Sequence, residues 1–440
     1  MPALAAHLDV ELLVAAGTHP EPPLDVRFRH HPLAELPRIA AERGLAAVVF
    51  QLGNHARFHG AIYRALLTHP GIVVLHEVVL HHMMRGLTLA AGDADGYVEA
   101  MRYAYGPTGE ALARRSIATG VPLDPYRYPL FERAVDAARA VVVHSRTTRD
   151  RVLSARPEAR VEVIPHFVEI GEEARGAASD PAAARVALGL PRDALVVATF
   201  GYLTAAKRLD ACLAAFARLR SQRPDAVFLL VGEVAPDLDL QRRLAGEAGA
   251  GVRVLGHLPL ERFLSAMVAT DVAFGLRHPT GGETSGAVMR LLALGKPVVV
   301  TEAGAFAEIP DGCAAKVLTD AFEAETLAAI LGRLGADAGL RSALGENARR
   351  WVATACSLPV VARAYATLVE EVVETGLPPT SPFPPVPPLA PYPLDDLLSE
   401  LLRRTAGELV DIGVANAAVA DDELAAIAHA VVEIGLDRVS

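Results

Sequence analysis

The sequence predicts an α/β fold built from two doubly wound parallel sheets. Short apolar runs alternate with longer stretches of helical spacing along most of the chain, which is typical of βαβ units. The chain has 440 residues, which is too long for one ordinary hydrophobic core and suits two domains with an extension. The stretch 167–190 is polar and then helical, and it divides the apolar runs into two sets. We therefore expect two Rossmann-like halves, residues 1–168 and 169–376, joined by a hinge.

The expected strands are the apolar runs themselves, which suit parallel strands buried on both faces. In open parallel sheets ligands bind beyond the carboxyl ends of the strands, so we expect the site in the cleft between the halves. The first half contains the runs VELLVAAG (10–17), AAVVFQL (46–52), GIVVLH (71–76), AVVVHS (140–145) and VEVIPH (161–166). The second half contains LVVATFGYL (195–203), AVFLLVGE (226–233), VRVLGHL (252–258), VAFGL (272–276), KPVVVTE (296–302) and AKVLTD (315–320).

Composition excludes several classes of protein. Hydrophobic residues make up 52% and charged residues 21% of the chain, as in a globular protein. The formal net charge is −10 and there is no basic tract, so nucleic acid is not an expected partner. The 3 cysteines are scattered without metal-ligand spacing, which favours the cytoplasm and predicts neither a disulfide framework nor a zinc site. No apolar run approaches the roughly 20 residues that span a bilayer, and peripheral contact with the inner membrane face remains open.

The C-terminal part departs from the α/β pattern. Residues 377–393 are too rich in proline for helix or sheet and predict an extended linker. Residues 394–440 read as amphipathic helices, which together form a helical tail. We expect this tail to pack on the body or to mediate self-association rather than to take part in catalysis.

A glycine-rich turn opens a helix after the run VAFGL and predicts an anion site. Turn residues at 279–282 are followed by helical spacing from Glu283 to Leu294 and then by a buried strand. A helix N-terminus offers unpaired N–H groups and a positive dipole end to an anion. Ser285 and Gly286 are placed to present those groups to a diphosphate. The alternative is an ordinary βα loop in which the glycines only satisfy turn geometry.

A second loop supplies cations. FGYLTAAKR places Gly201 at the end of a buried strand and delivers Lys207 and Arg208 a few residues later. Two cations facing a helix N-terminus would neutralise a diphosphate and stabilise it as a leaving group. The alternative is a solvated pair in the first helical turn, but cations are disfavoured at a helix N-terminus. We rank Lys207 ahead of Arg208.

These motifs resemble the retaining glycosyltransferases of the GT-B fold in the large family 4 group, which use nucleotide-sugar donors. The resemblance rests on FGYLTAAKR, LLVGE, VRVLGHL and HPTGGETSG, with fainter matches VVFQLGN, VVLHE and VIPHFVE, and it covers most of residues 40–375. It implies that Glu283 faces the donor sugar and that Leu255 and Thr284 contact the donor. The family usually carries a second glutamate for the ribose diol. Arg290 and Leu291 occupy the candidate positions for it here, and an arginine is able to touch a phosphate instead.

Polar residues also follow strands of the first half. His76 and Glu77 lie at the carboxyl end of GIVVLH, and the resemblance implies that this position contacts the donor sugar or the acceptor. Asn54 and His55 follow another strand and are expected to shape the acceptor pocket, unless they merely turn the chain. His81 and His82 belong to the next helix, and no metal site is expected. His144 is open between a site residue and a satisfied histidine at the edge of the core.

The resemblance also points to a missing element and to a reaction. The family begins with a strand and a glycine-rich loop that reaches the donor phosphates, whereas this chain opens at MPALAAHLDVELLV. Our hypothesis is that the start is truncated or that another segment fills the gap. The expected activity is retaining, metal-independent transfer of a sugar from a nucleotide-diphosphate donor to a glycan, lipid or small-molecule acceptor. Two alternatives remain open, a GT-B sugar-nucleotide epimerase and a non-catalytic nucleotide-binding or interaction protein.

Overall fold

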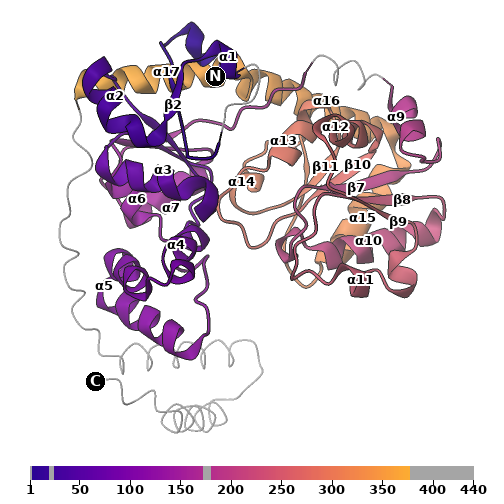
Figure 1. The fold of residues 1–440 in the computed structure, drawn as a ribbon. Coiled ribbons are helices and arrows are strands. Elements are labelled where there is room, and N and C mark those ends of the chain that lie inside the picture. Colours follow the sequence, from indigo (N-terminus) through magenta and orange to yellow (C-terminus); the bar gives the residue numbers. More distant parts are fainter. Residues whose placement is uncertain (1, 19–23, 172–179, 377–440) are drawn as a thin grey trace, which may run out of the picture. The chain divides into compact units, whose positions relative to one another are not determined.

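The computed structural model describes residues 2–18, 24–171 and 180–376 (Figure 1). These residues contain two larger parallel sheets and one small one. The predicted proline-rich linker at 377–393 and the predicted helical tail at 394–440 lie outside the described residues.

The first larger sheet organises an N-lobe, which we define as β3–β6 with their helices. Its four strands run in parallel in the order β3-β4-β5-β6, so their carboxyl ends meet at one edge. Valine and isoleucine dominate the two central strands, β4 and β5, which are buried along their whole length. All four strands were predicted. The elements are β3 (Val49–Leu52), α3 (Ala56–Thr68), β4 (Ile72–Leu75), α4 (His81–Leu87), η3 (Leu89–Ala91), α5 (Ala94–Thr119), α6 (Glu132–Asp136), β5 (Ala140–Val143), α7 (Arg146–Ala155) and β6 (Val161–Val163).

The run VELLVAAG does not join this sheet, in contrast to the expectation. It forms β1 (Leu12–Val14), which pairs in parallel with β2 (His30–Pro32) in a separate two-stranded sheet. Leu12 N–H donates to Arg29 O at 2.8 Å at the start of this pairing. The partner strand has no apolar run, and for that reason the sequence pattern did not predict it. The surrounding elements are η1 (Leu4–Ala6), α1 (Leu24–Arg27), η2 (Leu33–Glu35) and α2 (Leu36–Arg43).

The second larger sheet organises a C-lobe, which we define as β7–β12 with their helices. Its parallel strands lie in the order β12-β11-β10-β7-β8-β9. The chain adds strands outward on one side from β7 and on the other side from β10, so the strand order reverses between these two neighbours. Each strand was predicted from its apolar run. The strands are β7 (Val196–Phe200), β8 (Val227–Val231), β9 (Val252–Gly256), β10 (Val272–Gly275), β11 (Val298–Thr301) and β12 (Ala315–Val317). The helices are α9 (Pro181–Ala187), η4 (Ala205–Lys207), α10 (Leu209–Gln222), α11 (Leu240–Arg243), η5 (Gly246–Gly249), α12 (Leu260–Ala269), α13 (Gly286–Ala293), α14 (Gly304–Ala307), α15 (Glu323–Ala336) and α16 (Ala338–Ala355).

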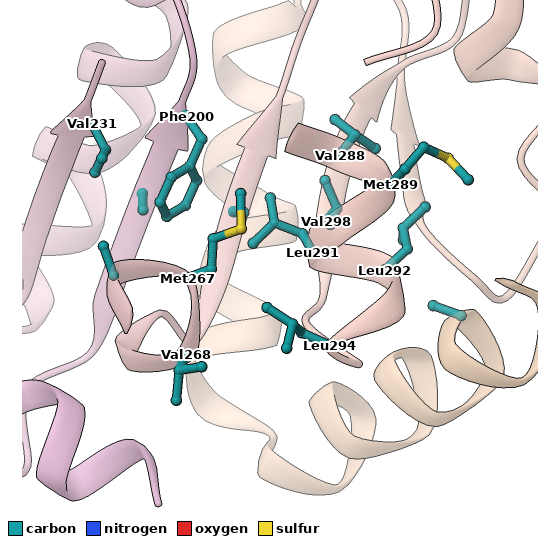
Figure 2. Close-up of a cluster of buried hydrophobic side chains, with 14 of the residues drawn as sticks. Phe200, Val231, Met267, Val268, Val288, Met289, Leu291, Leu292, Leu294 and Val298 are labelled. Carbon is teal, nitrogen blue, oxygen red and sulfur yellow. The ribbon is translucent and has the colours of Figure 1, made fainter. Parts of the chain in front are cut away.

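Two hydrophobic clusters cover the faces of the C-lobe sheet. Buried residues of α10 and α15 pack on one face, and buried residues of α12 and α13 pack on the other (Figure 1). Figure 2 shows Leu291 and Leu292 of α13 in the second cluster, with Phe200 and Met267. Burying each leucine contributes about 1.5–3 kcal/mol. This packing fixes the direction of α13 and therefore the place of its N-terminus beside β10.

The last described helix, α17 (Leu358–Thr375), packs on the N-lobe sheet although it follows the C-lobe in sequence. Val361 and Leu368 lie in one cluster with Ile72 and Val142. The expected division of the chain at residue 168 assigned this helix to the second half, and its apolar face explains the difference. The stretch 338–375, α16 with α17, is long and apolar enough to cross a membrane by length and composition alone. Both helices contribute residues to the hydrophobic clusters, as core helices do.

Candidate active site

The carboxyl ends of β7 and β10 carry the loops of the candidate site. These strands are neighbours at the point where the strand order reverses, which is where doubly wound sheets bind ligands. Gly201 follows β7 with a φ of +91°, a conformation that favours glycine. Gly232, which follows β8, leaves no room for a side chain, because a Cβ there would lie 2.1 Å from Gly201 O. The backbone is therefore closely packed directly behind the first loop.

Lys207 folds back from η4 toward the end of β7. Its side chain is buried, with 5% exposed, and Nζ donates to Phe200 O at 2.6 Å. Burial, together with the nearby Arg277 guanidinium, lowers the pKa of Lys207 to about 7. The charged form of Lys207 is disfavoured because it has lost its hydration, so an anionic ligand beside Nζ would stabilise it. The structure thus places Lys207 as the sequence predicted, at the carboxyl end of β7.

Arg208 does not accompany Lys207 as a second free cation. It adopts a φ of +56°, and its Nε donates to Glu323 Oε2 at 3.0 Å. Glu323 is 3% exposed in its side chain and begins α15. A buried carboxylate needs such a partner, so the Arg208 guanidinium is engaged by Glu323. The expectation of two neighbouring phosphate-binding cations is corrected for this residue.

Arg277 supplies a cation that the sequence analysis missed. It lies two residues after the end of β10, and its Nε lies 3.1 Å from Glu283 Oε1. Glu283 Oε2 in turn accepts hydrogen bonds from Gly281 N–H at 2.7 Å and from Thr280 Oγ1 at 3.0 Å. The signal was present, because Arg277 follows an apolar run at the same kind of strand end that pointed to His76. The loop therefore holds Glu283 between an arginine and its own backbone.

Helix α13 begins later than expected. Ser285 is its N-cap and accepts from Val288 N–H at 3.3 Å, so Glu283 and Thr284 lie in the preceding loop. The prediction of a helix from Glu283 is therefore wrong by three positions, because the Ser285 hydroxyl caps a helix whose first residue is Gly286. Arg290 Nη1 donates back to Gly286 O at 3.2 Å. Arg290 thus lies along the first turn of α13.

Two buried hydroxyl groups on these loops have no hydrogen-bond partner within the described residues. They are Thr204 Oγ1 and Thr284 Oγ1. Thr204 precedes Lys207 in the loop after β7, and Thr284 belongs to the loop after β10. Buried polar groups are normally satisfied, so orphaned ones on adjacent loops indicate a place for a polar ligand.

Asn54 and Glu77 meet at the carboxyl edge of the N-lobe sheet. Asn54 N–H donates to Glu77 Oε1 at 3.3 Å, and Asn54 Oδ1 accepts from Met83 N–H at 2.9 Å. Burial, together with the charge of Glu283, raises the pKa of Glu77 to about 7. His55 is exposed, and its ring lies 4.7 Å from that of Phe58. The structure therefore brings Asn54 to Glu77 and leaves His55 at the surface.

Histidines form a second group at the same edge. His76 Nδ1 lies 3.3 Å from His144 Nε2, and His144 Nδ1 lies 2.8 Å from Ile164 O. The His166 ring packs edge-on at 5.3 Å from the His144 ring. Burial lowers the pKa of His76 and of His144 to about 4, so both rings are neutral near pH 7. No group of three metal-binding side chains is found among residues 2–18, 24–171 and 180–376.

The two groups of loops touch each other. Val78 N–H, just after Glu77, donates to Gly281 O at 2.9 Å. Thr148 Oγ1 of α7 donates to Gly282 O at 3.1 Å. The glycine-rich turn after β10 therefore contacts the N-lobe edge through its carbonyl groups, and Glu77 lies close enough to Glu283 for their charges to interact.

The remaining predicted residue, Leu255, lies in the edge strand β9 and packs against the cluster of Figure 2. It is separated from β7 by β8. A surface hollow of about 510 Å³ is lined by residues 5–11 and 27–29, and none of the predicted site residues lines it.

Comparison with known proteins defines the class of this fold. Sucrose-phosphate synthase from Thermosynechococcus elongatus aligns with a TM-score of 0.59 at 17% identity, over 85% of this chain and 91% of that one. HepE of Anabaena, solved in complex with UDP, aligns with a TM-score of 0.52 at 17% identity, over 82% of this chain and 100% of that one. The two sheets and their connections are those of the GT-B glycosyltransferase fold.

Sequence comparison is more specific for the C-lobe. Residues 194–337 match the family model of the group 1 glycosyl transferases. D-inositol 3-phosphate glycosyltransferase of Corynebacterium jeikeium is 27% identical over 278 residues, which are 60% of this chain and 65% of that protein. The chain thus spans less than two thirds of that relative's length. The matched region contains Lys207, Arg277, Glu283 and α13.

Proposed function

We propose that this protein is a retaining glycosyltransferase that moves a sugar from a nucleotide-diphosphate donor to an acceptor hydroxyl. The observation that carries the proposal is the convergence of Lys207, Arg277 and the α13 N-terminus at the strand-order reversal of the C-lobe sheet. Cations and helix N-termini both favour phosphate groups. The unsatisfied Thr204 and Thr284 hydroxyls add donors beside them.

The similar proteins support a nucleotide-sugar donor. HepE of Anabaena was solved with UDP, and the Corynebacterium jeikeium relative is named as a glycosyltransferase acting on D-inositol 3-phosphate. A related protein from Corynebacterium glutamicum, 26% identical over 214 residues, is named as a GDP-mannose-dependent mannosyltransferase. These names differ in nucleotide and acceptor, so the proposal commits to the donor class and leaves the base and acceptor to experiment.

The roles follow from the contacts. Lys207 and Arg277 bind the diphosphate and stabilise the charge that develops when the bond from sugar C1 to phosphate oxygen breaks. Two cations supply this stabilisation without a metal ion. Glu283, held by Arg277 and the backbone, faces the donor sugar and stabilises positive charge on it.

The acceptor enters from the N-lobe edge near Asn54 and His76. Its hydroxyl oxygen forms the new bond to C1 on the face from which the diphosphate departs, and the hydroxyl proton passes to the leaving phosphate oxygen. Configuration at C1 is retained by this front-face path.

The test is to incubate the protein with UDP-glucose or GDP-mannose and an acceptor panel that includes inositol phosphate, and to follow sugar transfer by mass spectrometry. We expect transfer from one donor with the anomeric configuration retained, and its loss in Glu283→Gln. Glu370→Gln, the same substitution at an exposed glutamate of α17, is the matched control and should leave transfer unchanged. Donor binding without transfer or hydrolysis would contradict the enzymatic proposal, and inversion at C1 would contradict the retaining path.

A further inference from the structure

A chain of hydrogen bonds links the carboxyl ends of three neighbouring strands, and the proposed reaction does not explain it. His76 follows β4, His144 follows β5 and Ile164 follows β6. The contacts run from His76 Nδ1 to His144 Nε2 at 3.3 Å and from His144 Nδ1 to Ile164 O at 2.8 Å. The strand order β4-β5-β6 brings these residues side by side.

The Ile164 carbonyl sets the direction of this chain. A carbonyl oxygen only accepts, so His144 Nδ1 must carry the proton that it donates. The His144 ring is neutral near pH 7, because burial lowers its pKa to about 4. A neutral imidazole has one N–H, and therefore His144 Nε2 is bare and acts as an acceptor.

His76 then has only one arrangement that satisfies both rings. His144 Nε2 is an acceptor, so His76 Nδ1 donates to it. The His76 ring is also neutral, since burial and the neighbouring His166 and His59 rings lower its pKa to about 4. The second nitrogen, His76 Nε2, is consequently bare. Within the described residues, the hydrogen bond of the His76 ring runs through Nδ1, which leaves Nε2 available for a ligand.

We propose that His144 is a positioning residue that holds His76 as the Nδ1–H tautomer, so that His76 Nε2 accepts a hydrogen bond from a hydroxyl group of the carbohydrate substrate. The identity of the substrate rests on the proposed function, whereas the tautomer does not. A bare imidazole nitrogen selects a donor such as a hydroxyl and rejects an anionic oxygen. His76 Nε2 therefore provides a hydrogen-bond acceptor for neutral hydroxyl groups on the N-lobe, whereas the C-lobe provides the cations that hold the diphosphate.

The packing around the two rings supports a fixed orientation. The His76 and His144 ring centroids are 5.4 Å apart with planes at 33°, and His166 closes the other side of His144. The Nδ1 atom of His166 lies 2.7 Å from Phe167 O, and the Nδ1 atom of His59 lies 3.0 Å from Gln51 O. Each neighbouring ring thus donates to a backbone carbonyl, and neither competes for His76 Nδ1.

The direct test reads the tautomer in the full chain without substrate. Protein labelled with ¹⁵N at histidine is examined by long-range ¹⁵N–¹H correlation near pH 7.5, and His76→Gln and His144→Gln spectra assign the two rings. We expect both rings protonated at Nδ1 and bare at Nε2. A His76 ring protonated at Nε2 would overturn the proposal, whether or not the protein transfers sugar.

Two substitutions separate positioning from packing. His144→Gln keeps a group able to donate to Ile164 O and to accept from His76, whereas His144→Phe keeps only the ring volume. We expect His144→Phe to convert His76 to a mixture of tautomers and to lower kcat/KM about tenfold, the worth of one ordinary hydrogen bond. His144→Gln should keep the tautomer and most of the activity. An unchanged His76 tautomer in His144→Phe would refute the positioning role, and if that variant fails to fold the wild-type spectrum decides alone.

Discussion

Donor binding should consume a proton at alkaline pH because of Lys207. Burial and Arg277 lower the pKa of Lys207 to about 7, from an ordinary value of 10.5. A diphosphate placed beside Nζ favours the charged ammonium and raises this pKa again. A lysine that is mostly neutral in the free protein must therefore take up a proton when the donor binds.

The size of the effect follows from the free-state pKa. At about pH 8, roughly nine tenths of Lys207 is neutral, so about 0.9 proton should be taken up for each donor bound. Above about pH 7.5, affinity should fall about tenfold for each further pH unit, and below about pH 6 it should be nearly constant. Binding should take up a proton rather than release one, because the pKa of Lys207 is lower in the free protein than we expect it to be in the complex.

Isothermal titration calorimetry measures this proton uptake. Binding of UDP-glucose or GDP-mannose is recorded at pH 6 and pH 8 in buffers with different enthalpies of ionisation. Nucleotide sugars are suitable probes because each of their two phosphates carries one ester and shares the anhydride bridge, so neither keeps the hydroxyl that titrates near pH 6 in a terminal phosphate. Lys207→Met, which has similar length and no charge, should bind weakly and without proton uptake. The reasoning would be refuted if the wild-type protein bound the donor with an affinity independent of pH, or if Lys207→Met took up as many protons as the wild-type protein.

Two further substitutions test the surroundings of the site. Arg208→Met leaves the buried Glu323 without its cation and should lower the free energy of unfolding by about 1–3 kcal/mol in urea titrations. Donor affinity of the folded protein should change by less than about twofold. Full stability with lost donor affinity would show that Arg208 binds phosphate after all. Gly232→Ala places a Cβ 2.1 Å from Gly201 O at a φ of +145° and should cost about 2–4 kcal/mol by thermal unfolding. Gly332→Ala in α15 is the matched control, because its Cβ meets nothing within 4 Å and a helix prefers alanine by about 1 kcal/mol.

Apolar runs were sufficient to predict the strands of both larger sheets. Val196–Phe200 and Ile72–Leu75 are buried along their whole length, so their hydrophobicity is continuous and visible in the sequence. β2 escaped prediction because His30–Pro32 has no such run and forms a strand only by pairing with β1. The start of α13 was placed too early, since helical spacing does not reveal which of several polar residues caps a helix.

Single side chains at strand ends were predictable, but their partners were not. Lys207 and Glu77 were chosen because residues after a buried strand lie at the ligand-binding edge. The engagement of Arg208 by Glu323 joins residues 115 positions apart, and the His76–His144 contact joins residues 68 apart. Such pairs depend on strand order and loop conformation, which spacing along the chain does not encode.

The return of α17 to the N-lobe governs how this protein can be divided. A fragment that stops at residue 168 would leave Ile72, Val74 and Val142 without the side chains of α17 that cover them. Expression of the first half alone should therefore yield an aggregation-prone product, whereas a circular permutation that joins α17 directly to the N-lobe would retain its cover. The same helix makes the chain pass from one lobe to the other twice, so proteolytic cutting of the segment near Ile170 need not release either lobe from its partner.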